Sequence, residues 1–170
     1  SSTGRAAIMG ILNVTPDSFS DGGRYADVTL ALAHARAMIA AGADLIDVGG
    51  ESTRPNSTRI TPEAEWERIG AVVSALAGDG IIVSVDTLHA STARAAADAG
   101  AAFINDVSGG RWDPEMNAAV AQSGCAYVVQ HYRALPGMPG EHFDYGDDLV
   151  GTLIERVGSQ VQDAIDAGVT

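Results

Sequence analysis

The chain has 170 residues, of which 46% are hydrophobic and 19% are charged, a composition typical of a globular domain and not of a disordered chain. Ten basic residues against 22 acidic ones leave a formal charge of −12, which argues against nucleic-acid binding through the overall field of the protein. All ten basic residues are arginines. Schiff-base chemistry and a Walker-type phosphate lysine are therefore excluded from within these residues.

The single cysteine, Cys125, excludes an internal disulfide and is typical of a protein from a reducing compartment. The sequence contains neither a run of roughly 18 apolar residues nor a basic and apolar leader. We therefore expect a cytoplasmic protein that has neither a membrane nor a nucleic acid as a partner. Residues 1–6 lack an initiator methionine and are interpreted as a cloning remnant or a leader to the domain that follows.

Five short apolar runs predict buried strands. The first spans residues 7–14 and reads AIMGILNV, nearly continuous as in a parallel strand covered on both faces. The other four cover residues 45–48, 81–85, 102–104 and 126–129. Each of these four follows a glycine of the kind that ends helices, namely Gly42, Gly80, Gly100 and Gly124.

Alanine-rich segments with helical spacing follow the runs, at residues 28–41, 62–77, 90–99, 114–123 and 147–167. Two of them have clear starts, because Thr61 and Asp113 are N-cap residue types followed by a proline at the first helical position. The sequence thus predicts five successive strand–helix units, and hence parallel strands joined by right-handed crossovers.

Polar residues follow every predicted strand and distinguish the two α/β architectures that such units allow. In chain order they are Asn13, Asp47 with Glu51, Asp86, Asn105 with Asp106, and His131. A doubly wound sheet concentrates its site at one switch point, whereas a barrel builds its site from the carboxyl ends of many strands. We therefore predict a TIM (β/α)8 barrel, of which this chain supplies about five strand–helix units.

Four segments carry a resemblance to a known family. They read MGILNVTPDSFSDGG at residues 9–23, DVGGESTRP at 47–55, SVDT at 84–87 and INDVSGG at 104–110, and in this order and spacing they resemble those of dihydropteroate synthase. The resemblance covers nearly all of this chain but only the first five of the family's eight strand–helix units. It implies that residues 7–170 are the N-terminal part of a single pterin-binding barrel domain.

The resemblance implies a transferase of folate biosynthesis that condenses (7,8-dihydropterin-6-yl)methyl diphosphate with 4-aminobenzoate to give 7,8-dihydropteroate and diphosphate. It also implies Mg2+ as the cofactor, sulfonamides as competitors of aminobenzoate, and a homodimer for the intact enzyme. Because the family reaction proceeds by early loss of diphosphate, we expect a leaving-group clamp and a rigid pterin pocket rather than a strong base.

Four residues match family contacts to the pterin diphosphate and its metal. Asp86 and Asn105 match contacts to the pterin, Thr53 matches a contact to the pterin diphosphate, and Asn13 matches the contact to magnesium. An ionised carboxylate only accepts hydrogen bonds and so complements the N–H and NH2 edge of a pterin. From the residues alone, Asp86 fits equally well as the N-cap of the next helix, and Asn13 and Asn105 fit as turn residues.

Four further residues lie in the loops after the first and second strands. Phe19 and Asp21 match positions that fold over the site, and we assign Asp21 a catalytic role. Arg54 and Pro55 match the wall around the aminobenzoate, to which Phe19 also contributes. The length of the first loop and its serine, aspartate and glycine content are typical of functional loops.

The sequence departs from the family pattern in three respects. Gln130 stands where a methionine usually precedes the histidine after strand five, and Asn56 replaces a glycine. Counterparts of strands six to eight, which carry a pterin-contacting lysine and the anion site, are not found, and the chain stops where a sixth strand is expected to begin. We therefore expect the 170-residue piece alone to be inactive.

Two other functions are considered. One is another pterin-binding barrel of the methyltetrahydrofolate:corrinoid methyltransferase type, and the other is a non-catalytic pterin-binding fragment. Outside the expected site, Cys125 is interpreted as a small buried side chain and His89 as a surface or helix-end residue.

Overall fold

The computed structural model describes residues 4–15, 24–51, 59–131 and 145–170. The strands are β1 (Met9–Asn13), β2 (Leu45–Gly49), β3 (Val83–Asp86), β4 (Phe103–Asp106) and β5 (Ala126–Val129). The helices are α1 (Arg24–Ala40), α2 (Pro62–Gly78), α3 (Ala90–Asp98), α4 (Met116–Ser123) and α5 (Leu149–Asp166). Strands and helices alternate along the chain as predicted. Among these helices, none has the length and apolar character needed to cross a membrane.

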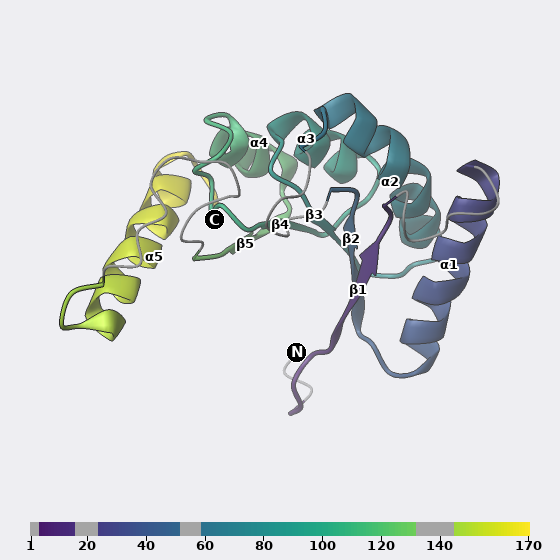
Figure 1. The fold of residues 1–170 in the computed structure, drawn as a ribbon, viewed down its shortest axis with the longest axis horizontal. Helices are drawn as coiled ribbons and strands as arrows, with labels where there is room; N and C mark the ends of the chain where they lie inside the picture. The colour runs from purple at the N-terminus through teal and green to yellow at the C-terminus, as the bar shows by residue number, and fades with distance from the viewer. Residues whose placement is uncertain (1–3, 16–23, 52–58, 132–144) are drawn as a thin grey trace.

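All five strands pair in parallel in one sheet, in the order β1-β2-β3-β4-β5. The order follows the chain without reversal, whereas a doubly wound sheet has a switch point at which the order reverses. The helices form an arc along one side of the curved sheet (Figure 1). The predicted α/β architecture, five strand–helix units of a barrel, is therefore confirmed.

One of the two predicted helix caps is correct and the other is wrong. The side chain of Thr61 accepts a hydrogen bond from Ala64 N at 3.3 Å and caps α2 as predicted. The cap of α4, in contrast, is Glu115 and not Asp113. Asp113 Oδ2 instead accepts a hydrogen bond from Ala90 N at 2.8 Å, at the start of α3. Its other oxygen, Oδ1, accepts a hydrogen bond from Glu115 N at 2.9 Å, so the side chain joins the start of α3 to the turn before α4 and is not the N-cap of α4.

The hydrophobic core lies between the sheet and the helices. Alternate residues of the strands face the helices, and six of them are at most 1% exposed: Leu12, Ile46, Val48, Val83, Val85 and Ile104. The helix residues buried in the same cluster are Ala31, Ala35, Ile69, Val72, Val73, Leu76, Ala93, Ala96, Met116 and Val120.

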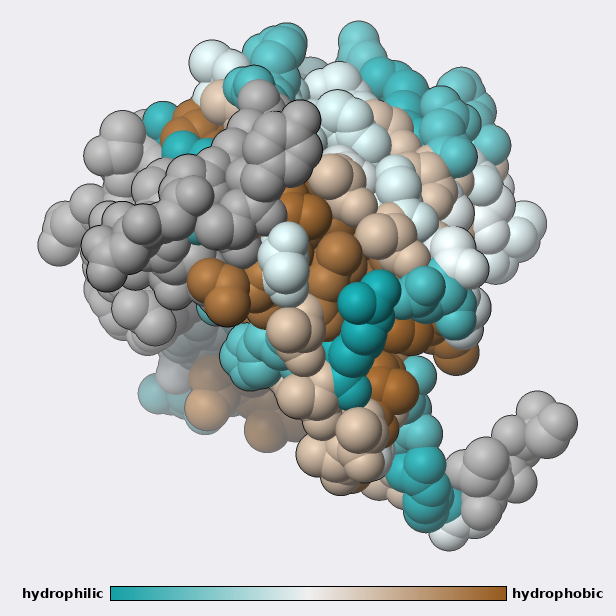
Figure 2. Space-filling view, turned by 90° about the vertical axis from the view of Figure 1, so that its right-hand side faces the viewer, coloured by the Kyte–Doolittle hydropathy of each residue, from teal (hydrophilic) through white to brown (hydrophobic). Residues whose placement is uncertain are grey.

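The opposite face of the sheet carries the intervening residues. On β1 these include Met9 and Ile11, which are 42% and 62% exposed, whereas Leu12 between Ile11 and Asn13 is buried. Figure 2 looks at the side of the molecule on which β1 and α1 lie, at the edge of the sheet, and shows hydrophobic surface at its centre. On the face of the sheet opposite the helices, apolar side chains such as Met9 and Ile11 are typical of residues that line a barrel interior.

A hydrogen bond on this inner face reflects the tilt of the strands. Asn105 Nδ2 donates to Asp47 Oδ2 at 3.0 Å, from β4 to β2 across β3. Asp47 is level with Ser84, and Ser84 with Phe103, so that Asn105 lies two residues beyond the level of Asp47. This stagger of about one residue per strand is typical of (β/α)8 barrels.

Gly50, directly after β2, lies so close to α2 that it has no room for a side chain. A Cβ atom on Gly50 would lie 2.8 Å from Ile69 Cγ2 and 3.2 Å from Glu65 Cγ. Gly78, the last residue of α2, has no neighbouring atom within 4 Å of such a position. The two glycines therefore form a matched pair of substitution sites.

We predict that Gly50→Ala lowers the free energy of unfolding by about 1–3 kcal/mol, because Ile69 must move to admit the methyl group. Gly78→Ala is expected to raise it by up to about 1 kcal/mol, because alanine favours the helix more than glycine does. Urea unfolding measures both changes. A Gly50→Ala variant as stable as the wild type would contradict the tight contact between the end of β2 and α2.

Candidate active site

Three of the predicted site residues lie in one row across the carboxyl end of the sheet. In the strand ladder Asn13 pairs with Gly49, Gly49 with Asp86, and Asp86 with Asn105. The row thus crosses β1, β2, β3 and β4. Because parallel strands all end at the same edge, residues distant in sequence come together here, and Asn13 and Asn105 are brought to the two ends of the row.

Gly49 leaves space between Asn13 and Asp86. A Cβ atom on this glycine would lie 3.5 Å from Asn13 Oδ1 and 3.6 Å from Asp86 Oδ2, an ordinary van der Waals contact. The two side-chain oxygens therefore flank a position that carries no side chain of its own. A ligand can reach the backbone of β2 between them.

Asp86 is the most strongly perturbed carboxyl group of the row. Burial raises its pKa to about 7, and the neighbouring carboxylates of Asp47, Glu65, Asp106 and Glu51 add to the effect. Within the described residues, the buried Oδ1 atom of Asp86 has no hydrogen-bond partner. The site therefore holds an acceptor that takes no donor from the described parts of the chain and can accept one from a ligand.

The alternative interpretation of Asp86 as a helix cap is wrong. The N-cap of α3 is His89, and Ala90 N, at the start of that helix, donates to Asp113. Asp86 therefore has no capping role at α3. Placing the carboxyl group of Asp86 beside other acidic groups costs free energy, and no capping or turn role in the fold offsets that cost.

Asn105 is only 4% exposed, and both ends of its amide have partners. Its Nδ2 donates to Asp47 Oδ2, and its Oδ1 accepts a hydrogen bond from Gln130 Nε2 at 2.6 Å. The other carboxylate oxygen of Asp47, Oδ1, is buried and has no hydrogen-bond partner in the described parts of the chain. Asn105 is thus more than a turn residue, because its side chain connects β2 to the end of β5.

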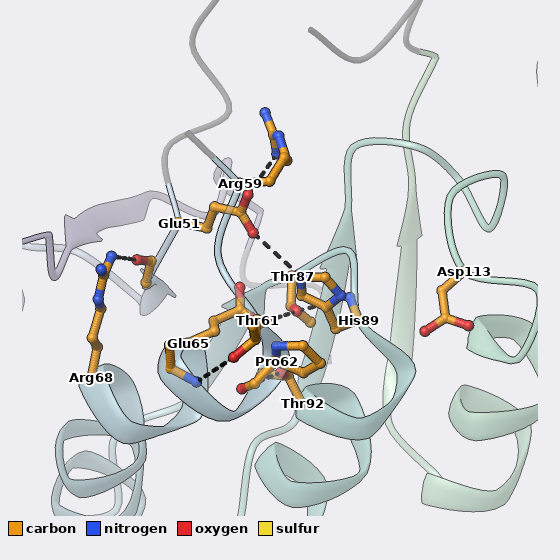
Figure 3. Close-up of polar contacts among 12 residues, drawn as sticks. Glu51, Arg59, Thr61, Pro62, Glu65, Arg68, Thr87, His89, Thr92 and Asp113 are labelled. Carbon is orange, nitrogen blue, oxygen red and sulfur yellow. Dashed lines mark hydrogen bonds and ion pairs between the residues drawn. The ribbon is translucent and has the colours of Figure 1, made fainter. Parts of the chain in front are cut away.

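A second polar cluster joins the segments after β2 and β3 to the start of α2 (Figure 3). Glu51 is 7% exposed and forms an ion pair with Arg59 at 3.0 Å and a longer contact with His89 Nε2 at 3.4 Å. Thr87 Oγ1 donates to the fully buried Glu65 at 2.7 Å, and burial raises the pKa of Glu65. The cluster holds Glu51 and Arg59, which precede and follow residues 52–58, against the start of α3.

The sequence identifies Glu51 only as a polar residue at a strand end and gives no sign that Arg59 is its partner. His89 is a helix-end residue, as predicted, but its contact with Glu51 was not predicted. A pairing of residues 38 positions apart has no local sequence signal. The sequence offers one indirect signal for such a pairing. Many carboxylates follow the strand ends, and burying them together favours a positively charged side chain such as Arg59 among them.

Five of the predicted residues, Phe19, Asp21, Thr53, Arg54 and Pro55, lie outside the described residues, as does Asn56. His131 is described, and its Nε2 lies 3.1 Å from the hydroxyl oxygen of Tyr145. Cys125 is partly buried, packs against the core, and its Sγ lies 3.2 Å from Ala101 O.

The raised pKa of Asp86 predicts a pH-dependent effect of Asp86→Asn. In the unfolded chain this carboxyl group titrates near 3.8 and in the folded chain near 7, so the folded state binds more protons between these values and its stability falls as the pH rises through this interval. The variant should match the wild type near pH 4 and exceed its stability by about 2–4 kcal/mol at pH 8. Urea unfolding across this range checks the prediction, and a constant difference would contradict it.

The contact between Glu51 and His89 predicts a raised pKa for the imidazole. The hydrogen bond to Glu51 raises the pKa of His89 above 6.5, and burial opposes it. Its stabilising effect is present below pH 6.5 and is lost as the pH rises through the folded-state pKa. In Glu51→Gln the pKa of His89 should fall, whereas Glu155→Gln on the exposed face of α5 should leave it unchanged. An NMR titration of the imidazole signals measures both, and an unaltered pKa in Glu51→Gln would disprove the pairing.

Known proteins are similar to this chain over the residues that form the sheet and the row. A family described as pterin binding enzyme matches residues 9–170. A curated dihydropteroate synthase from Mycobacterium leprae is 48% identical over 163 residues, which is 95% of this chain and 57% of that protein.

Two solved structures are similar over nearly the whole chain. A dihydropteroate synthase from Clostridium difficile, determined in the presence of pteroic acid, has a TM-score of 0.88 at 35% identity and is matched over 98% of this chain and 61% of its own. The enzyme from Xanthomonas albilineans with 4-aminobenzoic acid has a TM-score of 0.85 at 40% identity, over 98% of this chain and 58% of its own.

This chain thus spans somewhat more than half the length of these three proteins. The family match covers all five strands and the whole row from Asn13 to Asn105. By sequence and by fold, the chain belongs to the family of pterin-binding enzymes.

Proposed function

We propose that this chain is the pterin-binding part of a dihydropteroate synthase, which joins (7,8-dihydropterin-6-yl)methyl diphosphate to 4-aminobenzoate and releases diphosphate. The observation that carries the proposal is the row of Asn13, Gly49, Asp86 and Asn105, in which the buried Oδ1 atom of Asp86 has no hydrogen-bond partner among the described residues. A curated relative that shares this region is named dihydropteroate synthase, and two similar structures of that name were determined in the presence of pteroic acid and with 4-aminobenzoic acid.

The pterin ring fits the row through its hydrogen-bonding edge. The 2-amino-4-oxo ring presents N3–H beside an exocyclic NH2, and the ionised carboxylate of Asp86 offers two acceptors to this pair. Asn105 retains one N–H and one lone pair after its bonds to Asp47 and Gln130. Both groups are fixed on strands, so that the ring is held rigidly.

The acidic surroundings of the row suit the proposed reaction. Departure of diphosphate breaks the C–O bond at the pterin methylene and leaves a positive charge delocalised over the ring. The nitrogen of 4-aminobenzoate then forms the new C–N bond and loses a proton. The carboxylates of Asp47 and Asp86 are fixed negative groups that stabilise this cation without having to reorient.

The residues at the end of β1 fit a magnesium ion held mainly by the substrate. Asn13 is exposed and presents its amide oxygen beside Gly49, and an amide oxygen is a ligand of the hard type that Mg2+ prefers. Within the described residues, no group of three acidic, histidine or cysteine side chains could hold a metal by itself. When bound, Mg2+ would neutralise charge on the departing diphosphate.

The remaining roles extend the proposal to residues outside the described parts. Thr53 would contact the pterin diphosphate, Phe19, Arg54 and Pro55 would surround the aminobenzoate where sulfonamides compete, and Asp21 would act in catalysis. A homodimer and a cytoplasmic location stay predictions of the same kind.

Binding of 4-aminobenzoate in the presence of diphosphate tests the proposal. Calorimetry on the chain extended to the length of its relatives should show binding that requires diphosphate and Mg2+, and a sulfonamide should compete for it. The same chain should form dihydropteroate, whereas a polypeptide ending at Thr170 should not. A methyltransferase or a non-catalytic pterin binder would bind pterin without diphosphate-dependent binding of aminobenzoate, and this outcome would reject the synthase.

For Asp86→Asn we predict a loss of pterin affinity of roughly 2–5 kcal/mol, because an amide N–H replaces one of the two acceptors that face the ligand's donors. Calorimetric titration with pterin above pH 8, where the wild-type carboxyl is ionised, measures the change. Affinity equal to that of the wild type would remove Asp86 from the pterin site, even if the variant is more stable.

A further inference from the structure

The amide of Asn105 is held from two opposite sides by residues of different strands. Asp47, in β2, accepts its Nδ2–H at 3.0 Å, and Gln130, directly after β5, donates to its Oδ1 at 2.6 Å. Asp47 and Asn105 are each 4% exposed. Water therefore has little access to the bond between them.

These contacts determine which way the amide points. A carboxylate has acceptors and no N–H, so that Asn105 must direct its nitrogen toward Asp47 and its oxygen toward Gln130. Gln130 is then obliged to donate, and its own amide is oriented in turn. Asp47 is thus the group that gives a direction to the series Gln130, Asn105, Asp47.

The far end of the series is itself anchored. Gln160 of α5 is 6% exposed, and its Nε2 lies 3.3 Å from Gln130 O and 2.8 Å from Ser108 O. The backbone of Gln130 is therefore fixed to the segment after β4. A side chain on this backbone can hold a short, directed hydrogen bond.

We propose that Asp47 and Gln130 are positioning residues that fix the amide of Asn105 in the single orientation in which its remaining N–H and lone pair match a pterin ring. The role of Asn105 toward pterin rests on the proposed function. Asp47 acts through Asn105 in this arrangement. It retains its buried carboxylate because an uncharged amide at position 47 would allow Asn105 to point either way.

The series offers a direct test, because its direction can be reversed without a change in charge and almost without a change in size. Gln130→Glu places carboxylates at both ends, so that only one of them can receive the amide nitrogen of Asn105. The double variant Asp47→Asn/Gln130→Glu moves the carboxylate from one end to the other and turns the amide round. Gln122→Glu, on the exposed face of α4, adds the same charge away from the site.

Unfolding of the full-length chain in urea at pH 9, where carboxyl groups carry their charge, tests without a ligand whether Asp47 and Gln130 orient the amide of Asn105. We call this pair of contacts to Asn105 the clamp. Gln130→Glu should lower the urea midpoint well below that of Gln122→Glu, and addition of Asp47→Asn should restore it to the wild-type value. A midpoint for Gln130→Glu equal to that of Gln122→Glu, or no recovery in the double variant, would overturn the proposal.

Calorimetric titration with pterin, a 2-amino-4-oxopteridine without a diphosphate, tests the purpose of the clamp at the same pH. The double variant should bind pterin at least about tenfold more weakly than the wild type although its stability is restored, because the N–H and lone pair of Asn105 have exchanged places. A merely structural role predicts that affinity returns together with stability, and affinity within about twofold of the wild type would overturn the proposal. If the wild type itself binds no pterin, the proposed function fails while the urea midpoints still decide the clamp.

Discussion

Burial of negative charge at the carboxyl end of the sheet is the constraint on which the rest of this structure depends. Three aspartates near the strand ends differ in how many hydrogen bonds compensate the burial of their charge. Asp106 accepts hydrogen bonds from Ser108 N, Ser108 Oγ, Gly110 N and the hydroxyl of Tyr127, and serves to fold the turn after β4. Asp47 has one oxygen satisfied, whereas buried Oδ1 of Asp86 has no partner within the described residues. The degree of satisfaction thus separates the structural carboxylate from the one available to a ligand, since an unpaired buried acceptor is costly unless something else uses it.

The repeating pattern of apolar runs and alanine-rich segments was sufficient to predict the fold, because each strand–helix unit uses the same local rules. The errors occur where a neighbouring unit intervenes. Asp113 followed by Pro114 has the local sequence of a helix start, yet its side chain is shared between Ala90 N of α3 and Glu115 N, and α4 begins at Met116. The first helix begins at Arg24, earlier than the predicted residue 28. Such boundaries depend on packing between units, which periodicity does not encode.

The row of site residues was predictable for a related reason. Strand ends were located from the apolar runs, and parallel strands bring their ends together, so Asn13, Asp86 and Asn105 followed from one-dimensional information. The pairs Glu51 with Arg59 and Gln130 with Asn105 did not. Gln130 was noticed only as a departure from a methionine. Its hydrogen bond to Asn105 depends on the side-by-side packing of β4 and β5 and on the tilt of the strands, which no local pattern contains.

The hydrogen bond between Asp47 and Asn105 joins strands that are not neighbours. Adjacent strands lie about 4.8 Å apart, so that β2 and β4 are separated by roughly twice this distance. Two short side chains can meet across β3 only where the sheet bends toward them. The hydrogen bond between Asp47 and Asn105 therefore depends on the curvature of the sheet. If the sheet became flatter, this bond would break and the amide of Asn105 would be free to rotate, and a ligand bound to Asn105 would oppose that change. The curvature of the sheet and the orientation of the Asn105 side chain therefore depend on each other.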